Sequence, residues 1–254
     1  MRPRGCWTIS SRVANSLSRA VLLAAGFGLR MANANGLPKP LTDVVGKPLI
    51  YYPLVALREA GVQEAFIVIG HKGHLISKFL KHLKIPDIRL NFVRARHFHL
   101  GNGGSLAAVT RELVGDSFLL SMADHVFSPE LAERVLKSGP ISLGVDMLKG
   151  GNTPSEDDTK VLVDEMGFVR RIGKRIRMAN GIDTGVFNCD GRVLDAAHTL
   201  LSRKRVTVSC VMKHLLGKRV KIHAVDVSGL SWLDVDTPHD IPRAVSLLSV
   251  ITRR

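Results

Sequence analysis

Short apolar runs alternate with longer segments of amphipathic spacing along the first half of the chain. Four runs have the length and composition of buried strands: 20–25, 65–70, 90–93 and 117–123. Apolar residues recur with helical spacing over 51–60 and 71–82, and a further helical stretch is expected to reach about residue 113. This alternation predicts an α/β fold, in which a mostly parallel sheet carries helices on both faces.

The second half has shorter apolar runs, which predict five strands: 141–145, 160–163, 168–172, 182–187 and 220–225. Helices are expected over 191–202 and 208–216. A closing helix should follow Thr237 and Pro238, which suit the N-cap and the first helical position. We therefore expect one domain over residues 19–254 with two halves, about 19–125 and about 126–254, behind an N-terminal extension over residues 1–18.

Composition limits the class of protein. A chain of 254 residues with 45 % hydrophobic content can bury a full core. No apolar run approaches the roughly 20 residues that span a bilayer, so no transmembrane segment is expected. Cys6, Cys189 and Cys210 have no metal-ligand spacing, and we expect reduced thiols in a cytoplasmic protein.

The formal net charge of +14 raises the question of nucleic-acid binding. Basic residues are not gathered into one tract and aromatic residues make up only 5 %, so no nucleic-acid partner is expected. A basic surface also suits phosphorylated small molecules. The extension 1–18 is basic, rich in Ser and free of acidic residues; it superficially suggests a transit peptide and fits a loose tail equally, so we assign it no function.

The strongest local feature follows the first apolar run. Gly26 and Gly28 allow a tight turn and the close approach of backbone N–H groups to an anion. Arg30 follows, and Lys39 stands between two prolines on a segment predicted to be stiff and non-helical. These groups indicate a polyphosphate site, against the alternative of glycines kept for turn geometry beside solvated cations.

Two familiar phosphate loops fit this segment less well. A dinucleotide fingerprint needs a third small residue where this chain has Met31. A Walker loop needs Gly-Lys-Ser/Thr, whereas Gly46 and Lys47 run into Pro48. Instead, LAAGFGLR followed by PKPL resembles the signature of the sugar-phosphate nucleotidylyltransferases, with Leu29 in place of the usual Thr or Ser.

This resemblance implies a Rossmann-like three-layer sandwich of the nucleotide-diphospho-sugar transferase type. It makes residues 19–125 the nucleotide-binding half and residues 126–254 the acceptor-binding half. Arg30 and Lys39 take catalytic roles at the departing pyrophosphate. The residues that the motif assigns to nucleotide binding are Leu23, Ala24, Ala25, Gly26 and Gly28.

A second glycine-rich segment, 101–105, precedes the helical stretch that should end near residue 113. In the resembled family the matching segment lies against the nucleobase, which makes Asn102, Gly103 and Ser105 candidates for base recognition. The alternative is a helix-start turn with Ser105 as its cap. We regard metal ligation by His97 and His99 as the weaker reading of that nearby pair, because no third ligand lies close in sequence.

Carboxylates stand at two places where Mg²⁺ could bind. Asp124 ends an apolar strand, and a carboxylate there can hold Mg²⁺ while leaving positions open for phosphate oxygens; a turn or helix N-cap aspartate is the alternative. Asp234 and Asp236 share one face of an extended segment, as a metal site or as a solvated pair. The resemblance favours Mg²⁺ as the cofactor, with Asp124, Asp234 and Asp236 as its ligands and Asp124 also catalytic.

The resemblance also implies an acceptor site in the second half. Lys174 takes the place of a lysine that holds the acceptor phosphate, and is assigned a catalytic role, although Gly173 stands where Glu is usual. Lys160 is a second candidate for that phosphate, and a solvated strand charge is the alternative for both lysines. The residues expected to contact the acceptor's hydroxyl groups are Asp183, Thr184 and Gly185.

The residues of these motifs are most similar to those of the L-myo-inositol-1-phosphate cytidylyltransferases, which make CDP-inositol and pyrophosphate from CTP and inositol 1-phosphate. The alternatives are another sugar-1-phosphate or phosphocholine nucleotidylyltransferase, a molybdenum-cofactor guanylyltransferase-like enzyme, or a non-catalytic regulatory domain. The expected partners are a nucleoside triphosphate and a phosphorylated small-molecule acceptor. A membrane CDP-alcohol phosphotransferase that used the product would be a separate protein, and the sequence leaves the oligomeric state open.

Overall fold

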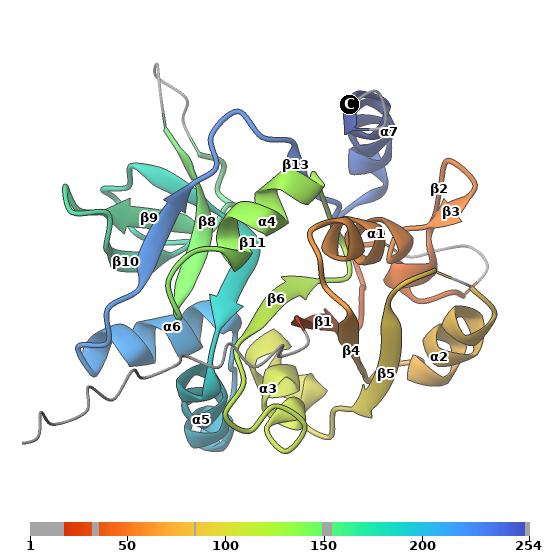
Figure 1. Cartoon of the computed structure of the whole chain (residues 1–254), viewed down its shortest axis with the longest axis horizontal. Helices are drawn as coiled ribbons and strands as arrows, with labels where there is room; N and C mark the ends of the chain where they lie inside the picture. Colours follow the sequence, from red (N-terminus) through yellow and green to blue (C-terminus); the bar gives the residue numbers. More distant parts are fainter. Residues whose placement is uncertain (1–17, 32–35, 84, 149–153, 252–254) are drawn as a thin grey trace, which may run out of the picture.

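A nine-stranded mixed sheet forms the centre of the protein (Figure 1). The computed structural model describes residues 18–31, 36–83, 85–148 and 154–251. Seven strands follow the order β10-β9-β11-β6-β1-β4-β5, and β8 adds to β11 with β12 beyond it. Most of the extension 1–18, together with Cys6, lies outside the described residues, and so does most of the loop that precedes Ser155.

The strands have these bounds: β1 Arg19–Ala24, β2 Asp43–Val44, β3 Lys47–Pro48, β4 Glu64–Ile69, β5 Arg89–Arg94, β6 Phe118–Met122, β7 His125–Phe127, β8 Ser142–Met147, β9 Lys160–Val163, β10 Val169–Gly173, β11 Gly181–Cys189, β12 His223–Asp226 and β13 Trp232–Asp234. The α-helices have these bounds: α1 Tyr51–Glu59, α2 Gly73–His82, α3 Asn102–Leu106, α4 Pro129–Leu136, α5 Gly191–Thr199, α6 Val208–Gly217 and α7 Ile241–Ile251. The short 3-10 helices have these bounds: η1 Lys39–Leu41, η2 Phe98–Leu100, η3 Ala107–Val109, η4 Leu200–Ser202 and η5 Pro238–Asp240.

The first half of the sheet is parallel, as the strand–helix alternation predicts. β1 pairs in parallel with both β4 and β6, and β4 pairs in parallel with β5. From β6 onward the pairs β6-β11, β11-β8, β11-β9 and β9-β10 are antiparallel. Parallel strands bring their carboxyl ends to one edge, so the segments after β1 and β6 meet there.

Helices cover both faces of the sheet (Figure 1). Side chains of α3, α5 and α6 share one core with the sheet, and those of α1, α2 and α4 share the core on the other face. A third cluster joins α7 to Val44, Val126 and Leu233, which anchors the β7-β13 ribbon. The three-layer α/β sandwich is confirmed, and the exact separation into two halves stays a prediction.

Two local predictions were wrong. Residues 39–41 form a 3-10 turn, because Pro38 is extended and Pro40 lies in the first turn, where a missing N–H group needs no partner. The helix expected to reach residue 113 is short: α3 ends at Leu106 and continues only as η3. Gly103 packs against the backbone of Thr207, and Gly104 packs against the backbone of His97. The segment therefore fits closely between the residue before η2 and the residue before α6.

Within the described residues, Cys189 and Cys210 are free thiols. No described helix is both long enough and apolar enough to cross a membrane.

Candidate active site

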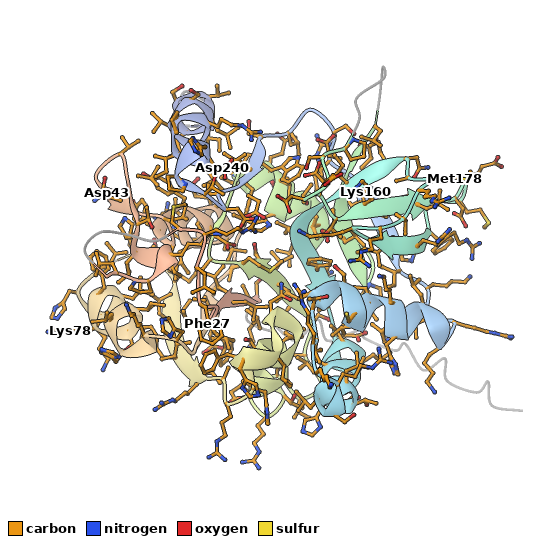
Figure 2. The ribbon with its side chains drawn as sticks, turned by 180° about the vertical axis from the view of Figure 1, so that it is seen from behind. Phe27, Asp43, Lys78, Lys160, Met178 and Asp240 are labelled. Atoms are coloured by element: carbon orange, nitrogen blue, oxygen red, sulfur yellow. The ribbon has the colours of Figure 1, made fainter. Side chains whose placement is uncertain are left out.

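A cavity of about 430 Å³ opens beyond the carboxyl ends of β1 and β6. Its walls come from the end of β1, the glycine turn, η1, the β6-β7 turn and the segment after β13. Phe27, labelled in Figure 2, lies near the end of β1 and lines the cavity. The lining residues are Leu23, Ala24, Gly26, Phe27, Gly28, Leu29, Arg30, Lys39, Pro40, Ala123, Asp124 and Asp236. Of the predicted nucleotide-binding residues of the first motif, all but Ala25 line this cavity.

The turn after β1 is built around Lys39. Gly28 has a φ of +62°, which favours glycine, and its carbonyl accepts a hydrogen bond from Met31 at 3.0 Å. A Cβ at Gly28 would lie 2.7 Å from Cβ of Lys39, so only glycine lets the lysine backbone pack this closely. The glycine turn therefore sets the position of the ammonium group as well as exposing backbone N–H groups.

Lys39 is buried and bridges two predicted metal ligands. Its Nζ lies 2.7 Å from Asp124 Oδ2 and 2.7 Å from Asp236 Oδ1. Burial lowers the pKa of Lys39, but Asp124 and Asp234 outweigh it and raise that pKa above its ordinary value. The lysine therefore stays cationic and neutralises part of a carboxylate cluster.

Arg30 reaches the same cluster from its outer side. Its guanidinium donates to Asp236 Oδ2 and lies 3.5 Å from the exposed Asp157 carboxylate. Asp157 in turn lies 3.5 Å from Nζ of Lys174. An acidic residue thus stands between the predicted pyrophosphate arginine and the predicted acceptor lysine.

Three side chains form a group that can hold a cation. Ligand atoms of Asp124, His125 and Asp234 all lie within 4.8 Å of one another. Asp234 Oδ1 is buried and has no hydrogen-bond partner among the described residues, which leaves a lone pair for an ion. Carboxylate oxygens are the ligands that Mg²⁺ prefers, so Asp124 and Asp234 fit that ion. Asp236 shares Lys39 with Asp124 and also pairs with Arg30.

The pKa values of this group reflect its buried charges. Burial alone would raise the pKa of Asp124, but Lys39 and His125 outweigh it and hold that pKa well below its ordinary value. Burial lowers the pKa of His125, yet the charges of Asp234 and Asp124 raise it to about 9. Burial raises the pKa of Asp234 to about 6, with Asp124 and Asp236 acting in the same direction. His125 thus supplies a positive charge 3.8 Å from the Asp234 carboxylate.

The predicted acceptor residues lie on β9, β10, β11 and the segments that join them. Lys160, labelled in Figure 2, donates from Nζ to the carbonyl of Lys174 at 3.1 Å, so the two predicted phosphate lysines are adjacent. Burial raises the pKa of Asp183 to about 6, and its carboxylate accepts a hydrogen bond from the N–H of Gly185 at 2.8 Å. Thr184 is fully buried and its hydroxyl donates to the carbonyl of Gly144, and its role at the acceptor stays a prediction.

The second glycine-rich segment has structural contacts. Asn102 Oδ1 accepts the N–H of Val208 at the start of α6. Ser105 is buried and donates to the carbonyl of Gly101. Gly103 packs against Thr207. The base-recognition roles of Asn102, Gly103 and Ser105 stay predictions, and none of the three lines the cavity beyond β1.

Two residues of the site were not predicted from the sequence. His125 follows Asp124 directly, and Asp157 stands three residues before Lys160. Their importance depends on contacts with Asp234 and Arg30, which are distant in the chain. Adjacency to an assigned aspartate was the only signal that could have found His125.

Comparison with known proteins agrees with this geometry. Residues 20–144 match the family model of the MobA-like NTP transferase domain. The chain is 32 % identical over 224 residues to a protein of Rubrobacter xylanophilus named bifunctional IPC transferase and DIPP synthase, a match over 87 % of this chain and 50 % of the relative. A protein of the same name from Thermococcus kodakarensis is 34 % identical, over 91 % of this chain and 50 % of the relative. The chain thus spans about half the length of these curated relatives.

Solved structures share the fold. The inositol-1-phosphate CTP transferase from T. maritima superposes with a TM-score of 0.81 at 26 % identity, covering 93 % of this chain and 96 % of that one. The UDP-glucose pyrophosphorylase from Acinetobacter baumanii has a TM-score of 0.70 at 16 % identity, covering 90 % and 92 %, and supports the fold alone. The phosphate turn, the buried Lys39 and Asp124 thus all lie within residues 20–144, the stretch that matches the MobA-like NTP transferase domain, in a fold shared with the solved inositol-1-phosphate CTP transferase.

Proposed function

We propose that this protein transfers a cytidylyl group from CTP to L-myo-inositol 1-phosphate, giving CDP-inositol and pyrophosphate. The observation that carries the proposal is the near-complete mutual coverage with the inositol-1-phosphate CTP transferase, at a TM-score of 0.81. The carboxylate cluster and Lys39 supply the charges that nucleotidyl transfer needs at the same place. The names of the curated relatives point the same way.

The reaction joins two phosphates. An oxygen of the acceptor phosphate forms a bond to the α-phosphorus, while the bond from that phosphorus to the oxygen bridging the β-phosphate breaks. Pyrophosphate leaves with the electron pair. The attacking oxygen is anionic near neutral pH, so no general base is required, and catalysis consists of positioning and charge neutralisation.

Residues of the first half act on the triphosphate. The N–H groups of the glycine turn and the ammonium of Lys39 bind its oxygens, and Arg30 at the rim neutralises charge on the departing pyrophosphate. Asp124 and Asp234 would hold Mg²⁺, which when bound polarises the phosphates and offsets their charge. Asp236 keeps Lys39 and Arg30 oriented before substrate arrives.

Residues of the second half act on the acceptor. Lys174 and Lys160 are neighbours and bind the acceptor phosphate. One carboxylate oxygen of Asp183, Oδ1, accepts the N–H of Gly185, and the other oxygen accepts hydrogen bonds from the acceptor's hydroxyl groups. The exposed Asp157 pairs with Lys174 and Arg30, and its ion pair with Lys174 must break when the acceptor phosphate binds to that lysine.

The test is pyrophosphate release with Mg²⁺, crossing CTP, UTP, GTP and dTTP against inositol 1-phosphate, glucose 1-phosphate, mannose 1-phosphate and phosphocholine. Mannose 1-phosphate with GTP is included because rice proteins named probable mannose-1-phosphate guanylyltransferases are 25 % identical over 87 % of this chain. Release with CTP and inositol 1-phosphate alone is the expected result. Release with a different pair would overturn the substrate assignment and keep the transferase.

A further inference from the structure

His125 lies between the two predicted metal carboxylates and the predicted acceptor loop. Its Nδ1 is 3.0 Å from Asp124 Oδ1 and 3.8 Å from Asp234 Oδ1. Its side chain is 12 % exposed, against 27 % for Asp124 and 41 % for Asp234, so the imidazole is the most buried member of the group. Nothing in the nucleotidyl transfer described above uses this residue.

The backbone explains why the ring stands there. β7 and β13 are antiparallel, and His125 is paired directly with Asp234. Side chains of directly opposed residues lie on the same face of the ribbon, so the imidazole meets the Asp234 carboxylate. Asp124 is the preceding residue, in the turn after β6, and Val235 N–H donates to its carbonyl at 3.0 Å. Two hydrogen-bonded segments thus present both carboxylates to one imidazole.

The other side of the ring is closed by Gly185 of β11. Gly185 has a φ of +76°, and a Cβ there would lie 2.3 Å from Nε2 of His125. The residues around Gly185 are fixed as well, since Asp183 accepts its N–H and Thr184 bonds to Gly144. The imidazole therefore touches the metal carboxylates with one edge and the acceptor loop with the other.

We propose that His125 is a positioning residue, which holds Asp124 and Asp234 in the arrangement that binds a divalent cation and joins that arrangement to the loop 183–185. The inference rests on the proposed function only in that the cation serves nucleotidyl transfer. The hydrogen bond from the ring reaches Asp124, and Asp234 lies at ion-pair distance from the same nitrogen. Loss of such a second-sphere contact to a ligating carboxylate costs roughly 10- to 100-fold in metal affinity. A residue that merely filled space would have no such effect.

The test compares two variants of equal size. Leu and Asn have the same shape, but only Asn donates a hydrogen bond in place of Nδ1–H. Mn²⁺ affinity is measured by electron paramagnetic resonance on the full chain, without nucleotide or acceptor. We expect His125→Leu to weaken Mn²⁺ binding 10- to 100-fold and His125→Asn to stay within about threefold of the wild type. Circular dichroism and thermal melting check that both variants fold, and His223→Ala, which removes an imidazole packed on Phe168, is the control.

Equal Mn²⁺ affinity for His125→Leu and the wild type would overturn the proposal, as would equal losses in the Leu and Asn variants. If His125→Leu does not fold, Gly185→Ala replaces it, because the new Cβ displaces the ring while both carboxylates and the imidazole remain. Gly185→Ala must then weaken Mn²⁺ binding at least tenfold, and unchanged affinity contradicts the proposal. Neither measurement uses CTP or inositol 1-phosphate, so the Mn²⁺ affinities can be interpreted even if the proposed function is wrong.

Discussion

The ammonium of Lys39 lies 2.7 Å from Asp124 Oδ2, inside a site where an ion is expected to bind. The same ammonium lies 2.7 Å from Asp236 Oδ1. The lysine therefore offsets part of the negative charge of the Asp124 and Asp236 carboxylates.

Replacing Lys39 by methionine should remove activity and stability together. The two carboxylates would lose a buried partner, which costs about 3 kcal/mol in the free energy of unfolding. We expect turnover to fall by at least 10²-fold, because the triphosphate loses its central cation. Steady-state kinetics and urea unfolding measure both effects. Lys47→Met, at a lysine over the Tyr51 ring, is the control, and near-normal turnover of Lys39→Met would contradict the role.

Gly28→Ala should displace Lys39, because the new Cβ would clash with the Lys39 Cβ. Gly28 and Gly46 both have positive φ values, +62° and +74°. Among the described residues, a Cβ at Gly28 would meet the Lys39 Cβ at 2.7 Å, and a Cβ at Gly46 would meet no atom within 4 Å. Backbone strain of about 1 kcal/mol applies to both alanine variants. The clash adds about 1 to 3 kcal/mol at Gly28 alone.

Urea unfolding of Gly28→Ala and Gly46→Ala separates the two contributions. The Michaelis constant for the nucleotide should rise for Gly28→Ala and stay unchanged for Gly46→Ala. Equal loss of stability in the two variants would show that the approach of Lys39 does not depend on glycine.

Much of this site follows from the sequence. The first apolar run, the glycine turn and the lysine between prolines predict a phosphate site at the end of β1, and the structure places Gly26, Gly28, Arg30 and Lys39 on one cavity. The strand 160–163 coincides with β9. These features are local, because strand propensity and turn chemistry depend on neighbouring residues.

The rest depends on contacts between distant segments. The carboxamide oxygen of Asn102, a candidate for base recognition, accepts the N–H of Val208, which lies 106 residues later in the chain. The role proposed for His125 depends on its contacts with Asp234 and Gly185, and the sequence near residue 125 does not predict these contacts. Such contacts come from sheet register and turn packing, which a single sequence leaves undetermined.

Asp183 should make stability depend on pH. Its pKa is raised to about 6 from 3.8, so between pH 4 and pH 6 the folded state retains a proton that the unfolded state releases. The free energy of unfolding therefore falls as pH rises through this window, by on the order of 2 kcal/mol from this group. Asp183→Asn removes the contribution.

Urea unfolding of wild type and Asp183→Asn at pH 4, 5, 6 and 7 tests this difference. The Asn variant should gain stability relative to the wild type as pH rises from 4 to 6. A constant difference across the series would contradict a raised pKa.

Asp157→Ala should change substrate binding without changing stability. Asp157 is exposed and lies 3.5 Å from both Arg30 and Lys174, so its ion pairs contribute less than about 1 kcal/mol. Its removal frees Lys174 for the acceptor phosphate, and the acceptor's Michaelis constant should fall a few-fold at low salt. Asp158→Ala is the control, since Asp158 bonds to the N–H of Ser155. A raised Michaelis constant in Asp157→Ala would show that the carboxylate helps to bind the acceptor.

The most direct test of the central claim follows the phosphorus atoms by ³¹P nuclear magnetic resonance in a mixture of CTP, L-myo-inositol 1-phosphate and Mg²⁺. The wild-type protein should convert the monophosphate and triphosphate signals into pyrophosphate and the two coupled signals of a diphosphate diester. Asp124→Asn, which keeps the size of the side chain and removes its charge, should slow this conversion by at least 10²-fold while remaining folded. A wild-type protein that leaves the substrate signals unchanged, or an Asp124→Asn variant that converts them at the wild-type rate, would contradict cytidylyl transfer at this site.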